Sequence, residues 1–227
     1  MTVAIVGGTG DLGFGLALRL AAAGQEVVIG SRSAEKAGDA VARAQEVLGP
    51  DAPVDGRANP EAVAAGDVTF VTVPFEGQAA TYRALKEAWR DGAIVCDTTT
   101  PLATAVGGAA TQVLRPWQGS AAEQAKALLP PGVRLASGFH SVGAEALEAL
   151  DGDLQGDVLL CGDGEAKAAV GGLVEKIGMR WVDCGPLTMA RILEPLTAVM
   201  IRVNKTYGLR DTGIRLTGRE RWGRSDA

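Results

Sequence analysis

The chain has 227 residues, 47% of them hydrophobic, and a formal net charge of −5. This length and composition fit one large domain with a real core, or one domain with a small appendix. The acidic balance excludes a chain that binds nucleic acid as a whole, and no charge-free apolar run reaches the roughly 18 residues of a membrane-spanning helix. The sequence starts with an apolar strand and no basic leader, so we expect a cytoplasmic protein.

Apolar, β-branched runs alternate with helical patterns along the first half of the chain. Strands are expected at 3–8, 26–31, 67–74 and 93–97, and helices at 12–24, from Ser33 to about Leu48, and at 76–90. Gly24 suits the end of the first helix and Ser33 the cap of the second. Asn59 is expected to cap a helix with Pro60 at its first position. The piece APVDGRA before it predicts turns, and a loop is expected from Thr98 to about Gln112.

The second half continues the alternation. A helix is expected around 119–129, strands at 132–138, 157–162 and 179–185, and further helices at 165–177 and 190–208, the last interrupted by Pro195. This order predicts an α/β fold: a Rossmann-type doubly wound, mainly parallel sheet with a small, mainly helical C-terminal extension. We place the dinucleotide-binding domain at residues 1–186 and the extension at 187–227, although a boundary nearer 150 also fits. Ligands are expected at the carboxyl ends of the strands.

A glycine-rich turn joins the first strand to the first helix. Gly8-Thr9-Gly10-Asp11-Leu12-Gly13 has the spacing G-x-G-x-x-G in the context that this motif requires. The glycines allow a tight turn and let a pyrophosphate approach the backbone, where helix N–H groups point at it. The Thr9 hydroxyl can contact a phosphate oxygen. The Asp11 carboxylate would repel a phosphate. We expect its side chain to point to solvent, where its charge interacts favourably with the N-terminal end of the helix dipole.

The end of the second strand predicts the type of dinucleotide. A free ribose 2′-hydroxyl selects a carboxylate there, but this chain has Ser31 and Arg32, with Lys36 in the first turn of the next helix. A hydroxyl and two cations suit a 2′-phosphate. A lysine near a helix N-terminus costs about 0.3–1 kcal/mol unless an anion lies beside it. The stretch therefore predicts NADP rather than NAD.

Two later strand ends are expected beside the nicotinamide. They read Val73-Pro74-Phe75 and Asp97-Thr98-Thr99-Thr100-Pro101, where the prolines restrict the loops and the threonines supply hydroxyls. No Tyr-x-x-x-Lys pair occurs, so we assign no catalytic residue. Hydride transfer between two heterocycles needs alignment rather than a strong protein acid.

Few other residues suggest chemistry. His140, in the segment SGFHSVGA, is the only histidine, so a histidine-based metal cluster is impossible and no metal is expected. It could hydrogen-bond a second substrate or be a structural residue, and both interpretations stay open. Cys96, Cys161 and Cys184 are far apart and end apolar runs, which is typical of buried reduced thiols.

The last 41 residues, from Leu187 on, are basic. They hold eight Arg or Lys against four Asp or Glu, although the whole chain is acidic. Such an asymmetry suggests an anionic partner, or simply a solvated basic tail.

With these segments in view, the chain resembles the NADPH-dependent oxidoreductases of the deazaflavin coenzyme F420. The resemblance covers nearly the whole length and is most specific in VGGTGDLGFGLALRL, VVIGSRSAEKA, FVTVPFEG, VLLCGDGEAK, DCGPLTMARILEPLTAVMIRVN and TGIRL. It implies reversible hydride transfer between NADP(H) and coenzyme F420, with the deazaflavin stacked on the nicotinamide. It also implies a homodimer, to which the helix at 190–208 would contribute.

The resemblance assigns residues as well. It implies NADP contacts from Gly8, Thr9, Gly10, Asp11, Leu12, Ser31, Arg32, Lys36, Val73, Pro74, Thr98 and Gly138. It implies deazaflavin contacts near Thr212, with His140 as a further candidate, and the anionic tail of F420 would suit the basic C-terminal surface. Asp11 stands where some relatives carry an amide, the CDTTTP loop differs from archaeal forms, and TGRERWGRSDA after Leu216 is an added tail.

Two alternatives remain open from the sequence. The chain could be an NADPH-dependent reductase of a flavin, a quinone or a chelated metal ion, because the second pocket is not defined by sequence. It could also be a non-catalytic NADP-binding redox sensor. In each case we expect small-molecule ligands and neither nucleic acid nor a membrane as partner.

Overall fold

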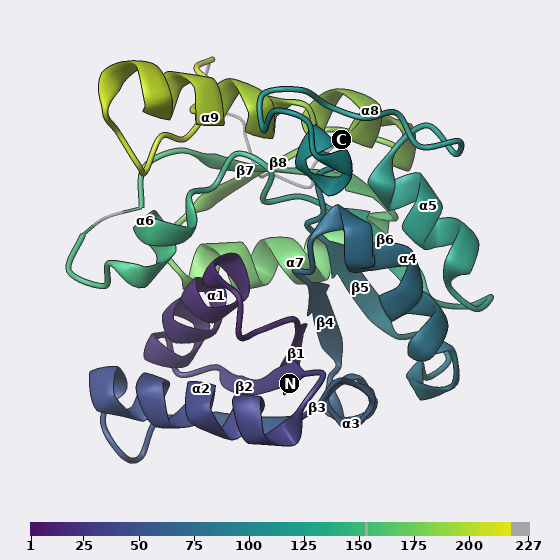
Figure 1. The fold of residues 1–227 in the computed structure, drawn as a ribbon. Helices are drawn as coiled ribbons and strands as arrows, with labels where there is room; N and C mark the ends of the chain where they lie inside the picture. The colour runs from purple at the N-terminus through teal and green to yellow at the C-terminus, as the bar shows by residue number, and fades with distance from the viewer. Residues whose placement is uncertain (153, 219–227) are drawn as a thin grey trace.

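The computed structural model describes residues 1–152 and 154–218 (Figure 1). Its centre is one eight-stranded sheet with the strand order β3-β2-β1-β4-β5-β6-β7-β8. The strands are β1 (Thr2–Val6), β2 (Glu26–Ser31), β3 (Val54–Ala58), β4 (Val68–Val71), β5 (Ile94–Asp97), β6 (Arg134–Ser137), β7 (Asp157–Gly162) and β8 (Arg180–Asp183). This order is that of a doubly wound sheet, as the sequence predicts.

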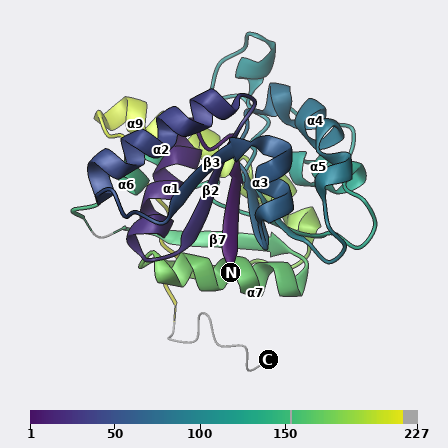
Figure 2. The same cartoon turned by 90° about the horizontal axis from the view of Figure 1, so that it is seen from below.

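Helices cover both faces of the sheet (Figure 2). They are α1 (Asp11–Ala22), α2 (Ala34–Leu48), α3 (Asn59–Ala65), α4 (Phe75–Ala84), α5 (Ala121–Leu128), α6 (Ala144–Glu148), α7 (Gly164–Lys176), α8 (Ala190–Leu193) and α9 (Leu196–Tyr207), with 3₁₀ turns η1 (Lys86–Ala88), η2 (Ala103–Val106) and η3 (Leu187–Met189). Side chains of α1, α2 and α7 pack on one face in the largest hydrophobic cluster. Those of α3, α4 and α5 pack on the other.

The helix ends follow the sequence signals. Gly24, with φ +75°, stands just after α1, where a left-handed residue is favourable. The Ser33 hydroxyl caps α2 by accepting a hydrogen bond from the Lys36 N–H at 3.5 Å. Pro195 separates α8 from α9, as predicted. Local chemistry thus sets where the elements begin and end.

Two local predictions were wrong, and one helix was not predicted. The piece APVDGRA contains the edge strand β3, which pairs with β2 in parallel. The segment after β6 contains the unpredicted helix α6, which lies against α1: Arg19 donates hydrogen bonds to the Leu147 and Ala146 carbonyls, both at 3.0 Å. Asn59 does not cap α3; Ala58 takes that position, and the buried Asn59 Oδ1 has no hydrogen-bond partner in the described part of the chain.

The last two strands reverse direction relative to the others. β7 runs antiparallel to β6, with Ser137 opposite Cys161, whereas β8 is parallel to β7. Because β6 ends at Ser137, the first four residues of β7 extend beyond it at the edge where the carboxyl ends of β1 to β6 lie. This extension forms a shelf beneath α8 and α9 (Figure 1).

The segment after α9 returns along this shelf. The Asp157 N–H donates to the Ile214 carbonyl at 2.6 Å, and the Asp157 carboxylate accepts from the Leu216 N–H at 2.6 Å. Arg180 pairs with the same carboxylate at 2.8 and 2.6 Å. Asp157 is only 2% exposed, so this ion pair ties the C-terminal segment to the sheet.

The three cysteines were expected to be buried, reduced thiols. All three cysteines are free thiols, but only Cys96 and Cys161 are buried, while Cys184 is half-buried. No helix in the described part of the chain combines the length and the apolar character needed to cross a bilayer. Residues 1–152 and 154–218 contain no cluster of three or more side chains able to hold a metal ion.

Candidate functional site

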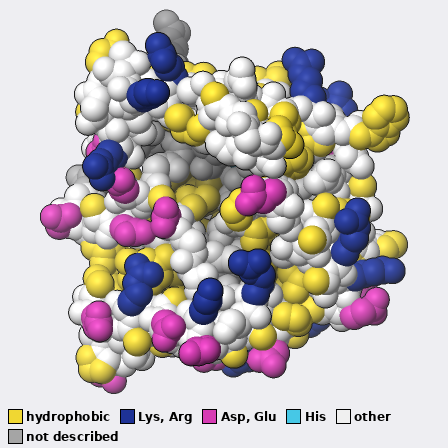
Figure 3. Space-filling model, viewed as in Figure 1, with side chains coloured by type: hydrophobic (Ala, Val, Ile, Leu, Met, Phe, Trp, Pro, Cys, Tyr) yellow, Lys and Arg dark blue, Asp and Glu magenta, His cyan; other side chains and the backbone are white. Residues whose placement is uncertain are grey.

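A cleft of about 880 Å³ opens at the carboxyl ends of β1, β2 and β4. In the space-filling view, this face of the molecule is hollowed near its centre, and charged side chains of both signs lie around the hollow (Figure 3). The cleft is lined by Gly7, Thr9, Gly10, Asp11, Leu12, Ser31, Arg32, Ser33, Lys36, Asn59, Thr72, Val73, Pro74, Glu76, Gly77, Thr81 and Ala144. Nine of the twelve predicted NADP-contacting residues are among them: Thr9, Gly10, Asp11, Leu12, Ser31, Arg32, Lys36, Val73 and Pro74.

The glycine turn forms one wall of the cleft. Gly10 precedes α1 and offers no side-chain cap, and the first hydrogen bond of the helix runs from the Phe14 N–H to the Gly10 carbonyl at 2.8 Å. The N–H groups of the first turn therefore remain available to an anion. A Cβ atom at Gly13 would lie 2.8 Å from the Gly7 carbonyl oxygen, so only glycine lets the helix approach β1 this closely.

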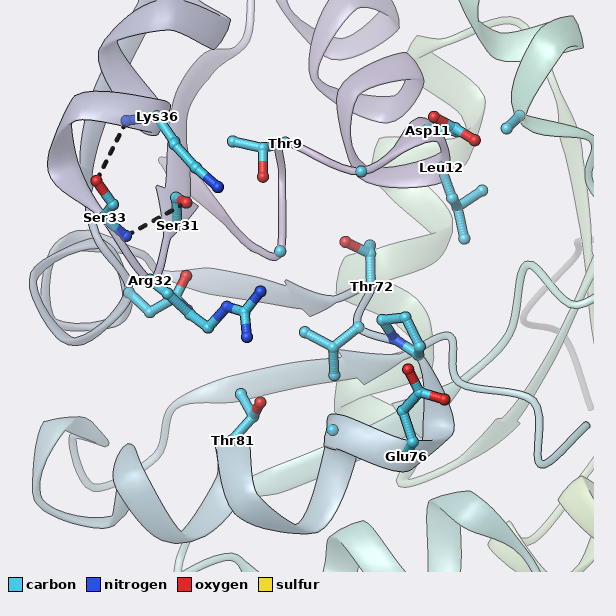
Figure 4. A pocket seen from close by; sticks show the side chains of 17 residues that line it. Thr9, Asp11, Leu12, Ser31, Arg32, Ser33, Lys36, Thr72, Glu76 and Thr81 are labelled. Carbon is cyan, nitrogen blue, oxygen red and sulfur yellow. Dashed lines mark hydrogen bonds between the residues drawn. The ribbon is translucent and has the colours of Figure 1, made fainter. Parts of the chain in front are cut away.

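The cationic residues lie together at one end of the cleft (Figure 4). Ser31 ends β2 and is nearly buried, and its hydroxyl accepts a hydrogen bond from the Ser33 N–H at 3.4 Å. Arg32, just after β2, and Lys36, in the first turn of α2, are both exposed. The Lys36 side chain extends toward Thr9, and the Arg32 side chain extends into the cleft toward the side of Thr72 (Figure 4). Two cations and two hydroxyls are groups that a phosphate monoester prefers.

The end of β4 forms the opposite part of the cleft. The Thr72 side chain lines the cleft, and its hydroxyl donates to the Val6 carbonyl at 3.0 Å, so its proton is used to join the ends of β4 and β1. Val73 and Pro74 follow as an apolar wall, and Pro74 occupies the N-cap of α4 in an extended conformation. Gly77 and Thr81 continue that wall along α4. A flat, weakly polar ring would suit this surface.

Three predicted NADP-contacting residues lie outside the cleft lining. The Gly8 N–H is used within the protein, where it donates to the Ile5 carbonyl of β1 and the Gly30 carbonyl of β2. The Thr98 hydroxyl is buried and donates to the Val71 carbonyl at 3.0 Å. A Cβ atom at Gly138 would come 2.4 Å from Leu160 Cδ2, so close packing of β7 against this residue explains the glycine.

His140 belongs to a buried polar cluster between the strand ends and α9. Its Nε2 lies 3.0 Å from the Ser137 hydroxyl and its Nδ1 lies 3.3 Å from the Thr100 hydroxyl. Thr100 in turn bonds the Thr197 hydroxyl at 2.8 Å. Burial lowers the pKa of His140 to about 4, so the ring is neutral at pH 7. Thr212, the other predicted deazaflavin contact, donates its hydroxyl proton to Asn204 on α9.

Two buried carboxylates lie below these loops and were not predicted. Asp97 accepts hydrogen bonds from the Tyr82 hydroxyl at 2.7 Å, the Gln78 amide at 3.0 Å and the Thr99 N–H at 3.0 Å. Glu194, between α8 and α9, accepts from the Ala121 and Ala122 N–H groups at 2.9 Å each. Removal from water raises the pKa of Asp97 to about 6 and that of Glu194 to about 8, despite these bonds.

We expect Glu194 to make the fold less stable as the pH rises from 6.5 to 8. Its pKa is higher in the folded than in the unfolded chain, so the native state holds a proton that the unfolded state releases. The free energy of unfolding should fall by about 1–2 kcal/mol across this window. Burial lowers the pKa of His140 in the fold, so near pH 6.5 only the unfolded chain binds its proton, and this group adds a smaller change of opposite sign. Urea titrations at the two pH values measure the change. Glu194→Gln should remove most of it, and the exposed Glu87→Gln should keep it; an equal slope in all three proteins would contradict the assignment.

Several cleft residues carry little signal in the sequence. Thr72, Glu76, Gly77 and Thr81 lie beside the predicted Val73-Pro74 wall, so they could have been found by continuing that wall into the following helix. Asn59 directly follows β3 and Ala144 begins α6. The sequence pattern predicted neither element, so it could not place these two residues at the cleft.

Residues 2–101 match the family model described as "NADP oxidoreductase coenzyme F420-dependent". The chain is 41% identical over 221 residues to the F420-dependent NADP reductase of Methanothermobacter thermautotrophicus, covering 96% of this chain and 95% of that protein. It is 43% identical over 225 residues to the F420-dependent NADP reductase of Methanocaldococcus jannaschii, covering 97% and 100%.

A solved structure agrees with these similarities. A crystal structure from Arthrobacter sp. FB24, described as a candidate F420-dependent NADP reductase, superposes with a TM-score of 0.79 at 25% identity. The superposition covers 95% of this chain and 99% of that one, so it includes the C-terminal helices as well as the sheet.

Proposed function

The chain belongs to the family of coenzyme F420-dependent NADP oxidoreductases, and from this premise we propose that NADP lies in the cleft of the glycine turn. The protein is an oxidoreductase that transfers a hydride reversibly between NADP(H) and the deazaflavin coenzyme F420. One observation carries the placement of NADP: the open N-terminus of α1 and the cations Arg32 and Lys36 line a single cleft.

The cleft residues fit the parts of NADP in order. The N–H groups at the start of α1 would hold the pyrophosphate, and Ser31, Arg32 and Lys36 the 2′-phosphate. Val73 and Pro74 would support one face of the nicotinamide. Asp11 is exposed, which would keep its carboxylate in solvent beside a pyrophosphate.

The chain's own task is alignment. When bound, one of the two coenzymes supplies a hydride and the other accepts it. The protein therefore has to hold two flat rings with the reacting carbons about 3–3.5 Å apart. Neutral His140 is not suited to be a general acid at pH 7. With Thr100 and Thr197 it joins the proposed nicotinamide loop to α9, and we propose that this cluster and the segment at Thr212 form the deazaflavin side of the site.

The C-terminal surface favours two further proposals. Arg202, Lys205, Arg210 and Arg215 are exposed and would attract the anionic tail of F420. The helices α8 and α9 also expose Ile192 (60%) and Val199 (50%), which supports a homodimer that buries this face. The free thiols fit a reducing compartment, so we propose a cytoplasmic enzyme.

The function is tested by an anaerobic optical assay. Purified protein is mixed with NADPH and oxidised coenzyme F420, and the visible absorbance of the deazaflavin is followed. We expect fast bleaching with NADPH, and little with NADH in its place. Bleaching of a flavin but not of F420 would instead identify a flavin reductase, and NADPH binding without any turnover would identify a redox sensor.

A further inference from the structure

The charges around the cleft are separated by sign. The cations Arg32 and Lys36 lie at one end with Thr9 and Ser31, whereas Asp11 and Glu76 lie on opposite walls at the other end (Figure 4). The phosphates account for the cations. Neither NADP recognition nor hydride transfer, as described above, gives a role to the Glu76 carboxylate.

Glu76 is held where the nicotinamide is proposed to lie. It stands two residues after Pro74 in the first turn of α4, and both residues line the cleft. Figure 4 shows the Glu76 carboxylate turned toward the side of the cleft where Thr72 lies. Among residues 1–152 and 154–218, no ion pair neutralises it. Its charge is therefore available to a ligand.

The two redox forms of NADP differ in charge at this end only. The oxidised nicotinamide ring carries a positive charge, and the reduced ring is neutral. A nearby carboxylate attracts the first and is indifferent to the second. Arg32 and Lys36 act on the 2′-phosphate, which is the same in both forms, so their contribution cancels in a ratio of affinities.

Two other charges lie near Glu76: the partial positive charge at the N-terminus of α4 and the carboxylate of Asp11. The N-terminus of α4 carries a partial positive charge that would disfavour a cationic ring, and Glu76, in its first turn, offsets it. Asp11 has the same sign as Glu76 but lies on the opposite wall, in the first turn of α1 beside the proposed pyrophosphate.

We propose that Glu76 is a specificity-determining residue. Its carboxylate raises the affinity of the cleft for NADP⁺ relative to the affinity for NADPH. This inference rests on the proposed function, because it requires the nicotinamide to lie beside Val73 and Pro74. Tighter binding of the oxidised form makes the bound reduced form a better hydride donor, because less free energy is needed to lose the hydride.

Dissociation constants of NADP⁺ and NADPH test the proposal, by calorimetry and by NADPH fluorescence respectively. In Glu76→Gln, we expect the constant for NADP⁺ to rise about two- to fivefold and that for NADPH to stay the same. Glu76→Asp keeps the charge and should retain most of the wild-type ratio. The matched control is Glu61→Gln, an exposed first-turn residue of α3 that does not line the cleft.

Salt provides a second readout. When salt is added to the wild type, the ratio of its dissociation constants for NADP⁺ and NADPH should approach the ratio measured for Glu76→Gln. In Glu76→Gln itself, added salt should hardly change this ratio. Equal weakening of both ligands, or no change in the ratio, would overturn the role of Glu76. Failure of the wild type to bind either form would instead overturn the proposed function.

Discussion

Replacing Arg32 with alanine should weaken the binding of NADP about 100-fold while changing the affinity for NAD less than about threefold. Arg32 is exposed and lines the same cleft as Ser31 and Lys36, and these are the residues proposed to hold the 2′-phosphate. Each charge-assisted hydrogen bond to a phosphate is worth about 1.5–3 kcal/mol, and a guanidinium can make two of them. Calorimetric titration with both dinucleotides measures the effect.

A matched variant separates this role from a general effect of charge. Arg57→Ala also removes one cation, from an exposed ion pair with Asp55 on β3, and should leave both affinities unchanged. The double change Ser31→Glu with Arg32→Asp should go further and favour NAD, because a carboxylate suits a free 2′-hydroxyl. Equal losses for NADP and NAD in Arg32→Ala would be incompatible with the 2′-phosphate site.

Replacing Gly13 with alanine should damage both the fold and the binding of NADP. The added methyl group would lie 2.5 Å from the Thr72 hydroxyl oxygen and 2.8 Å from backbone atoms of Gly7 and Gly8. Backbone atoms cannot rotate away as a side chain can, so α1 has to shift away from β1. The shift moves the N–H groups at the start of α1 away from the proposed pyrophosphate position. We expect a loss of about 1–3 kcal/mol in the free energy of unfolding and at least a tenfold weaker affinity.

Gly38 supplies the comparison for this experiment. It lies within α2, and a Cβ atom there would meet no atom within 4 Å. Gly38→Ala should therefore stabilise the protein by about 0.5–1 kcal/mol through helix propensity alone. Chemical denaturation of both variants gives the two values. Similar stability changes in Gly13→Ala and Gly38→Ala would show that close packing at the turn is not what requires Gly13.

The core strands were predictable because each is marked by its own consecutive residues. β2 and β7 have the predicted bounds, since each is a buried apolar run that ends at glycine or a turn residue. The edge strand β3 was missed because its exposure alternates and its sequence holds Asp55 and Gly56. Gly56 is not a turn residue here: a Cβ atom there would lie 2.8 Å from the Ala37 carbonyl oxygen of α2, so packing requires the glycine.

The site was predictable to the same extent. The glycine turn and the strand end at Ser31 are short motifs whose chemistry is contained in consecutive residues. Glu194 shows what such motifs leave out. A glutamate in an amphipathic helix is expected to be exposed, yet this one is 1% exposed, because the first amides of α5 approach it from a segment about 70 residues earlier. Only the tertiary fold brings those groups together.

The antiparallel join between β6 and β7 has a mechanical consequence. Enzymes built from two lobes commonly open and close around a hinge, which is a short linker between separately packed bodies. In this molecule the dinucleotide strands and the shelf under α8 and α9 belong to one hydrogen-bonded sheet, joined at Ser137 and Cys161. Bending between the two ring sites would have to break ladder hydrogen bonds, so the sheet acts as a rigid frame. If the two rings bind as proposed, we therefore expect the coenzymes to exchange through local movements of side chains and loops, with the spacing of the two ring sites set by the sheet before either coenzyme binds.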